Sequence, residues 1–206
     1  MEVAGDSGAV RLIRTCINTL AGVPSIVFGL FGLAFFIIYL QPKLGLEGGS
    51  SIVAGGLTLG LLVLPIMIRA SEEAIRAVPA AYKEAALALG AGRLRCFVTV
   101  TLPAALPGIL TGVILSLSRA AGETAPILFT AAVAIGQAPW PPWAALWRGT
   151  PTLSYSAYHL AVGDRLAAVV PHNQYGMIMT LILLVLVLNL VAIGLRWRLS
   201  RRLRGQ

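Results

Sequence analysis

The sequence predicts an all-α fold, a polytopic bundle of transmembrane helices. Of the 206 residues, 57% are hydrophobic and only 12% are charged, which is too apolar for an ordinary soluble domain. Several apolar runs exceed the roughly 18–20 residues that an α-helix needs to cross a bilayer. Basic residues gather at the ends of these runs, as they do where membrane helices meet water.

The apolar runs predict four spans within one transmembrane domain, residues 17–195. A cytoplasmic segment (1–16) is expected before this domain and a basic cytoplasmic tail (196–206) after it. The spans are expected at residues 17–40, 52–68, 107–125 and 175–195, with residues 126–135 bent or re-entrant and residues 70–103 forming a loop. The bend is expected because residues 104–135 would reach roughly 48 Å as one helix, against a hydrocarbon core of about 30 Å.

The net charge of +8 is explained by membrane topology and does not indicate a nucleic-acid partner. Arginines follow the second span and are dense after the fourth, and two more precede the first span. Such a bias marks the cytoplasmic ends of membrane helices. Both termini are therefore predicted to be cytoplasmic, in a chain whose surroundings are membrane lipid. The arginines after the fourth span are Arg196, Arg198, Arg201, Arg202 and Arg204.

A polar island interrupts the apolar runs at residues 84–103, which read EAALALGAGRLRCFVTVTLP. Residues 80–89 are almost all strong helix formers. Pro79 suits the first position of this helix, and Gly90 suits a left-handed cap at its end. After this glycine, residues 93–102 are expected to form a second short helix. The apolar side of the first helix is expected to carry Tyr82, Ala85, Ala86 and Leu89.

The spacing of this island resembles the EAA loop of ABC importer permeases, a MetI-like family. In that family the loop is a coupling helix that docks on a cytoplasmic ATPase. The resemblance implies the same role here, while an ordinary amphipathic loop is the alternative reading of the same residues. Val100 stands where the family usually has isoleucine. The residues that match the motif are Glu84, Ala85, Ala86, Gly90, Leu102 and Pro103.

Arg119 and Glu123 lie well inside the third apolar stretch. Each would cost about 2.5–3.5 kcal/mol at the bilayer centre, so a lipid-facing, unpaired position is disfavoured. Their spacing of four residues places them on one helical face, within reach of an ion pair. Such a pair can merely lock a helix into its bundle, or it can line a translocation path on which Arg119 weakly attracts an oxyanion. We favour the path, with Ser116 and Thr124 as its further polar residues.

The residues around this pair, 102–131, resemble the PstA-type permeases of phosphate importers, most specifically in the run RAAGETAP at residues 119–126. Residues 22–36 carry the same resemblance. It implies that the chain forms half of a phosphate pathway in the bacterial plasma (inner) membrane. The implied partners are a second, PstC-like permease, a PstB-like cytoplasmic ATPase dimer and a PstS-like phosphate-binding protein, periplasmic or lipid-anchored. Members of this family usually have more spans, so the resemblance also implies that this chain lacks their N-terminal part.

The residues alone are also compatible with other functions. An importer for sulfate, molybdate or phosphonate, a PstC-type permease, and a passive channel or scaffold subunit are the alternatives. An enzyme is not expected, because the sequence lacks the glycine-rich phosphate-binding loop with its lysine and shows no catalytic motif. ATP hydrolysis would be the work of a separate chain. No cofactor, metal site or disulfide is expected from Cys16, Cys96, His159 and His172.

Overall fold

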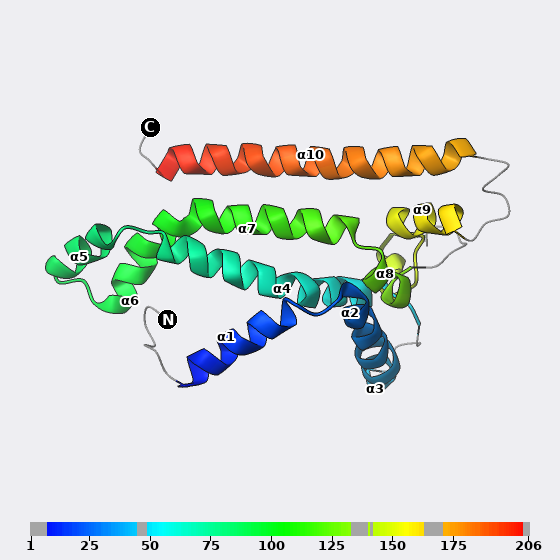
Figure 1. Cartoon of the computed structure of the whole chain (residues 1–206), viewed down its shortest axis with the longest axis horizontal. Coiled ribbons are helices and arrows are strands. Elements are labelled where there is room, and N and C mark those ends of the chain that lie inside the picture. The colour runs from blue at the N-terminus through cyan, green and yellow to red at the C-terminus, as the bar shows by residue number, and fades with distance from the viewer. Residues whose placement is uncertain (1–7, 45–48, 133–139, 141, 163–170, 204–206) are drawn as a thin grey trace. The chain divides into compact units, whose positions relative to one another are not determined.

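The computed structural model describes residues 8–44, 49–132, 140, 142–162 and 171–203, and in these ranges it is almost entirely helical (Figure 1). Within these described ranges, four helical stretches are long and apolar enough to cross a membrane, as predicted: Ser25–Lys43, Ile52–Arg76, Arg93–Gly122 and His172–Arg198. The elements are α1 (Gly8–Leu20), α2 (Ser25–Gly32), η1 (Leu33–Leu40), α3 (Gln41–Lys43), α4 (Ile52–Arg76), α5 (Ala80–Ala88), α6 (Arg93–Cys96), η2 (Phe97–Thr101), α7 (Leu102–Gly122), α8 (Ala125–Thr130), η3 (Pro142–Trp147), α9 (Leu153–Val162) and α10 (Pro171–Leu203). Of these, η1 and η2 are π-helical and η3 is a 3₁₀-helix.

The chain divides into two compact units, which we describe separately. The first unit comprises Met1–Gly22, Leu64–Leu117 and Leu188–Gln206. The second unit comprises Val23–Val63 and Ser118–Val187. Helices α4, α7 and α10 are therefore each divided between the two units.

The first apolar run, expected to form a span at residues 17–40, is divided into two helices at Pro24. Helix α1 ends at Leu20, and α2 begins at Ser25 after Pro24, whose φ of −58° and ψ of 142° are not helical. Proline has no N–H for the helical ladder, and here it sits just before the first residue of a new helix. The helical stretch able to span a membrane thus starts at Ser25, and residues 17–20 belong to a separate helix.

The second run continues beyond residue 68, where its span was expected to end. Helix α4 runs without interruption to Arg76 and contains Pro65 in its interior. From the sequence, Ser71 followed by Glu72 and Glu73 suits the start of a new helix, but this expectation is wrong because Ser71 lies inside α4. An ion pair between Glu72 and Arg76, four residues apart, supports the helix past the proline.

The third run is also more continuous than expected. Residues 93–102 do not form a separate short helix, since α6, η2 and α7 make one helical stretch from Arg93 to Gly122. The carbonyl that the Pro103 ring would meet belongs to Thr99, which lies in the widened π-helical turn η2. The bend falls at residues 123–124, and Pro126 opens α8 in its first turn instead of breaking a helix. Residues 133–135 of the expected bend lie outside the described residues.

The fourth helix, α10, exceeds the expected span of residues 175–195 at both ends. The basic residues after the span continue the helix because positive charge is favourable near a helix C-terminus. Within its candidate span, none of the best apolar window is buried inside the chain. Its apolar surface is therefore available to membrane lipid or to another protein.

In the second unit, three glycines let helices approach one another closely. The Gly29 position lies against the backbone of Pro126 on α8, and Gly32 lies against the side chains of Thr58 and Thr130. A Cβ at Gly55 would come within 2.5 Å of the Ala131 side chain. Small residues allow such approaches between membrane helices. These contacts join α2, the part of α4 that precedes Leu64, and α8 as one packed group.

A buried set of hydrogen bonds joins the same elements. Ser51 Oγ accepts hydrogen bonds from Gln41 Nε2 at 3.0 Å and from the Ala54 N–H at 3.1 Å. The Ser51 N–H donates to the Thr130 carbonyl at 2.9 Å. The Gly49 N–H donates to Gln41 Oε1 at 3.1 Å. Since buried polar groups require partners, these bonds hold α3, the start of α4 and the end of α8 in one arrangement.

In the first unit, α4 and α7 pack through a second seam of small residues. A Cβ built at Gly108 would lie 2.6 Å from the Ala74 side chain, and one built at Gly112 would lie 2.6 Å from the Ala70 side chain. The two pairs are one helical turn apart on both helices, as in small-xxx-small packing. The seam gives α7 a firm connection to α4 next to the segment that carries α5 and α6 (Figure 1).

Candidate functional site

The first candidate site is the corner formed by α5 and α6 in the first unit (Figure 1). Pro79 is the N-cap of α5, with a φ of −56° and a ψ of 137°, so the helix begins one residue later than expected, at Ala80. Ala80–Ala88 consists mostly of strong helix formers, which explains its helical state. The helix packs on α6 and η2.

Gly90 ends α5 in the left-handed conformation that the sequence predicts. Its φ is +83°. The Ala91 N–H donates to the Ala86 carbonyl at 3.1 Å, and the Gly90 N–H donates to the Leu87 carbonyl at 2.9 Å. These two bonds form the Schellman motif, in which a residue with positive φ closes the last turn of a helix. The chain therefore turns sharply here, and only glycine adopts this backbone conformation without strain.

The outer surface of α5 is open. None of its residues is buried, and Tyr82, Leu87 and the following Leu89 are exposed, the last with 90% of its surface accessible. Glu84 and Ala85 are exposed on the same helix, and Ala86 is half-buried. A short helix with this many accessible apolar side chains offers a contact surface to another protein.

The remaining two motif residues lie on the connection into the membrane helix. Leu102 and Pro103 begin α7, directly after η2, on which α5 packs. Thus the structure places all six residues of the motif in the first unit, on the α5 corner and on the helix that follows it. Leu94 and Val98 are exposed, while Phe97 is half-buried.

The second candidate site is the ion pair of Arg119 and Glu123 in the second unit. Arg119 Nε lies 3.4 Å from Glu123 Oε1. The side chain of Arg119 is 52% exposed, whereas that of Glu123 is 16% exposed. Glu123 follows the last residue of α7, and Thr124 is the N-cap of α8, so the pair lies where the chain bends. A half-exposed guanidinium held by a mostly buried carboxylate can attract an anion without holding it tightly.

Ser116 does not fit the expected accessible stripe. It is 4% exposed and belongs to the first unit, and its Oγ has no hydrogen-bond partner within the described part of the chain. Thr124 is half-buried and makes no side-chain capping bond to α8. The structure brings Arg119 and Glu123 together, while the roles of Ser116 and Thr124 on a path stay predictions.

One charged cluster was missed by the sequence reasoning. Glu72 on α4 accepts from Arg14 of α1 at 3.0 Å and also pairs with Arg76. The spacing of Glu72 and Arg76 signals this pair, but only if the helix is expected to continue through Ser71. No sequence signal indicates that Arg14, 58 residues earlier, meets the same carboxylate.

Among the described residues, no three histidine, cysteine, aspartate or glutamate side chains gather as a metal ion would require. Cys16 is exposed and Cys96 is buried, and neither forms a disulfide.

Comparison with known proteins gives one family for almost the whole chain. The model of the binding-protein-dependent transport system inner membrane component matches residues 9–205. The chain is 46% identical over 131 residues to the "Probable ABC transporter permease protein YqgI" of Bacillus subtilis, covering 63% of this chain and 42% of that protein. It is 41% identical over 124 residues to the phosphate transport system permease protein PstA 1 of Mycobacterium tuberculosis, covering 60% and 39%.

A third relative, the phosphate transport system permease protein PstA of Xylella fastidiosa, is 38% identical over 130 residues, covering 63% of this chain and 43% of that protein. The matches thus span about two fifths of the length of these curated relatives. Among solved structures, an inward-facing MetNI methionine ABC transporter chain superposes with a TM-score of 0.73 at 19% identity. This match covers 96% of the present chain and 78% of the transporter chain, so the two share a fold.

Proposed function

The chain belongs to the family of binding-protein-dependent transport system inner membrane components, and on that premise we propose that it is the membrane permease subunit of an ATP-driven phosphate importer. It is a multi-pass membrane protein whose relatives include several phosphate transport system permeases. Phosphate as the solute rests on these relatives and on the PstA-type run at residues 119–126. Import of sulfate, molybdate or phosphonate is the alternative that a transport assay separates.

The observation that carries the proposal is the open, glycine-capped helix α5. Its apolar side chains are exposed, and the Schellman motif fixes the turn at its end. Such a short helix can insert into a cleft on a partner protein. We assign that partner as a cytoplasmic ATPase dimer of PstB-like type. A PstC-like second permease and a PstS-like binding protein complete the assembly, with both termini of this chain on the cytoplasmic side.

Movement of α5 has a physical route to the membrane helices. The helix packs on α6 and η2, which continue into α7 without a break, and α7 is held to α4 by the glycine–alanine seam. Closure of the ATPase dimer would therefore displace the inner part of α7 together with α5, as a rigid element in a two-state transition. Hydrolysis is carried out by the ATPase, and this chain supplies coupling and half of the path.

Co-purification tests the coupling surface. Replacing Leu89 by aspartate puts a charge at the most exposed apolar position of the α5 corner, so we expect the ATPase to be lost from the purified complex. Leu12→Asp is the matched control, because Leu12 is also exposed but lies on α1. If the ATPase stays bound to the Leu89→Asp variant and is lost from the control, α5 is not the docking surface. A passive channel would retain no ATPase even in the unchanged protein.

Substitution of Glu123 by glutamine tests the translocation path. The variant keeps the shape of the side chain and removes the charge that holds Arg119, so we expect uptake of radiolabelled phosphate to fall at least several-fold. Glutamine keeps a side-chain oxygen that can still accept a hydrogen bond from Arg119, so the amount of protein in the membrane is expected to stay near normal. Glu73→Gln, at an exposed position of α4, is the charge-matched control. Loss of accumulated protein without a transport defect per molecule would show that the pair has a packing role.

A further inference from the structure

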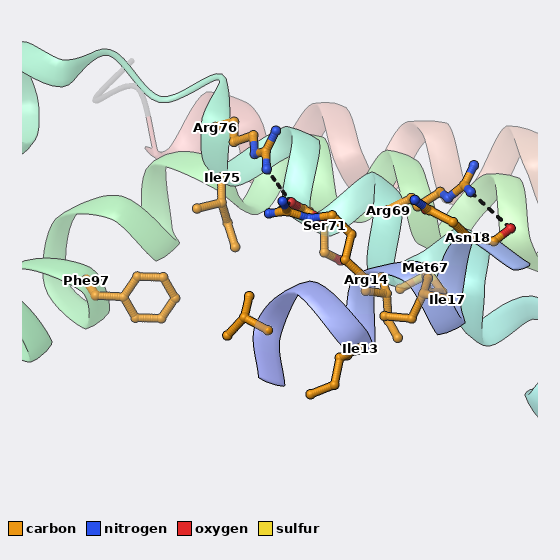
Figure 2. A pocket seen from close by; sticks show the side chains of 13 residues that line it. Ile13, Arg14, Ile17, Asn18, Met67, Arg69, Ser71, Ile75, Arg76 and Phe97 are labelled. Carbon is orange, nitrogen blue, oxygen red and sulfur yellow. Dashed lines mark hydrogen bonds and ion pairs between the residues drawn. The ribbon is translucent and has the colours of Figure 1, made fainter. Parts of the chain in front are cut away.

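A groove of about 850 Å³ lies in the first unit between α1, the charged end of α4 and Phe97 (Figure 2). Its size is in the range of small-molecule sites, roughly 300–1,000 Å³. The walls are apolar, formed chiefly by Val10, Ile13, Ile17, Met67, Ile75 and Phe97. The groove plays no part in the coupling surface or in the Arg119–Glu123 pair.

Charged side chains line the groove beside these apolar walls. Arg14, Arg69 and Arg76 contribute three positive charges, and Glu72 contributes one negative charge, so the lining carries a balance of +2. Arg14 and Arg76 both pair with Glu72, and Arg69 donates to the Asn18 carbonyl at 3.4 Å (Figure 2). An apolar channel bordered by an excess of guanidinium groups is complementary to a molecule with a hydrocarbon part and an anionic head.

The surroundings of the groove indicate which molecule this is. Helix α4 is long and apolar enough to cross the membrane, and Arg69–Arg76 form its charged end, which puts the groove where the hydrocarbon core gives way to the polar interface. Helix α1 has no buried residue and exposes Leu12 and Ile13 beside Arg11 and Arg14, a composition typical of helices that lie in the interface. Anionic phospholipids are abundant in that layer and bind basic pockets between membrane helices.

We propose that this groove binds one anionic phospholipid, with its phosphate near Arg69 and Arg76 and an acyl chain along Ile13, Ile17 and Ile75. The lipid would bridge α1 and α4 in addition to the Arg14–Glu72 ion pair. Its occupancy would stabilise the segment of the first unit from which α4 leads into α5.

The test measures thermal protection of the detergent-purified full chain. Phosphatidylglycerol is expected to raise the unfolding midpoint, while phosphatidylcholine with the same acyl chains and inorganic phosphate at the same concentration are expected to leave it unchanged. Equal protection by phosphatidylcholine would refute the charge argument, and equal protection by inorganic phosphate would reassign the groove to small anions. Absence of protection by phosphatidylglycerol would overturn the proposal.

Paired variants separate the groove from general surface charge. Arg69→Gln is expected to weaken phosphatidylglycerol binding roughly fivefold, whereas Arg11→Gln, on α1 but outside the groove lining, is expected to leave it within about twofold. Ile13→Asn is expected to weaken it as well, in contrast to Leu12→Asn at the neighbouring exposed position. Equal effects in both members of either pair would place the lipid elsewhere.

Discussion

Replacement of Gly90 by proline is expected to abolish coupled phosphate uptake while the chain still inserts into the membrane. Gly90 has a φ of +83°, and proline fixes φ near −65°. The substitution also removes the N–H that donates to the Leu87 carbonyl. The strain and the lost bond together cost about 3 kcal/mol or more, comparable to a proline inside a helix. Gly90 lies outside the four candidate spans, between Arg76 and Arg93. The substitution is therefore expected to change the orientation of α5 and to leave the spans intact.

Two measurements check this expectation, and both rest on the proposed function. Uptake into cells is expected to fall at least tenfold, and ATP hydrolysis by the complex is expected to lose its dependence on the solute-binding protein. Gly90→Ala should show a smaller defect, because a left-handed backbone costs about 1–2 kcal/mol for a residue with a Cβ. Gly92→Ala is the matched control: Gly92 has a φ of −67° and open space around its Cβ position, so wild-type behaviour is expected. Normal uptake by the Gly90→Pro variant would refute the proposal that α5 and α7 move together as a rigid element.

Local physical signals explain why the sequence predicts the α5 corner well. A run of alanines and leucines after Pro79 favours a helix whatever surrounds it, and Gly90 is the residue that a left-handed cap requires. The number of spans follows for a similar reason, because the length of an apolar run is a direct measure of its ability to cross a bilayer. These features depend on neighbours in the sequence, and the structure confirms them.

The positions at which the membrane helices begin and end could not be predicted from such local signals. Pro65 and Pro107 lie inside helices, whereas Pro24 separates two helices and Pro126 opens one. Proline lacks the backbone N–H in every case, which removes a hydrogen bond inside a helix but none at the start of one, and the packing around it decides whether the helix continues. The bend was likewise expected at Pro126, but it falls two residues earlier, after Gly122. Sequence alone gives the candidates for a break without ranking them.

Contacts between distant segments escaped prediction altogether. The Arg14–Glu72 pair, the bonds of Ser51 with Gln41 and Thr130, and the groove beside Phe97 each join residues from separate helices. Periodicity places a residue on a face of its own helix, and it carries no information about which other face it will meet. Gly29 and Gly32 in the first run are small enough to allow close helix packing, but the sequence does not indicate which residues they meet.

Its close contact with Thr58 and Thr130 makes Gly32 the position where a substitution has the largest expected effect on stability. A Cβ at Gly32 would overlap the side chains of Thr58 and Thr130, both fully buried. Thr58 Oγ1 donates to the Ala54 carbonyl and Thr130 Oγ1 donates to the Pro126 carbonyl, each at 2.7 Å, so neither side chain can rotate away without losing a buried hydrogen bond. We therefore expect Gly32→Leu to exceed the 1–3 kcal/mol typical of overpacked cores, because displacement of α8 also disturbs the bond from Ser51 to Thr130.

Thermal unfolding in detergent and the amount of protein in the membrane measure this effect. Gly60→Leu is the matched control, since Gly60 lies inside α4 with no atom within 4 Å of its Cβ position. The control is expected to unfold at nearly the wild-type temperature, and Gly32→Leu is expected to unfold at least several degrees lower or to fail to accumulate. Partial rescue by Thr58→Ala in the Gly32→Ala background would identify the shared space as the cause, because removal of the threonine Oγ1 and methyl frees the volume that the new Cβ needs. Equal tolerance of leucine at Gly32 and Gly60 would mean that α2 and α4 are not in contact at this glycine.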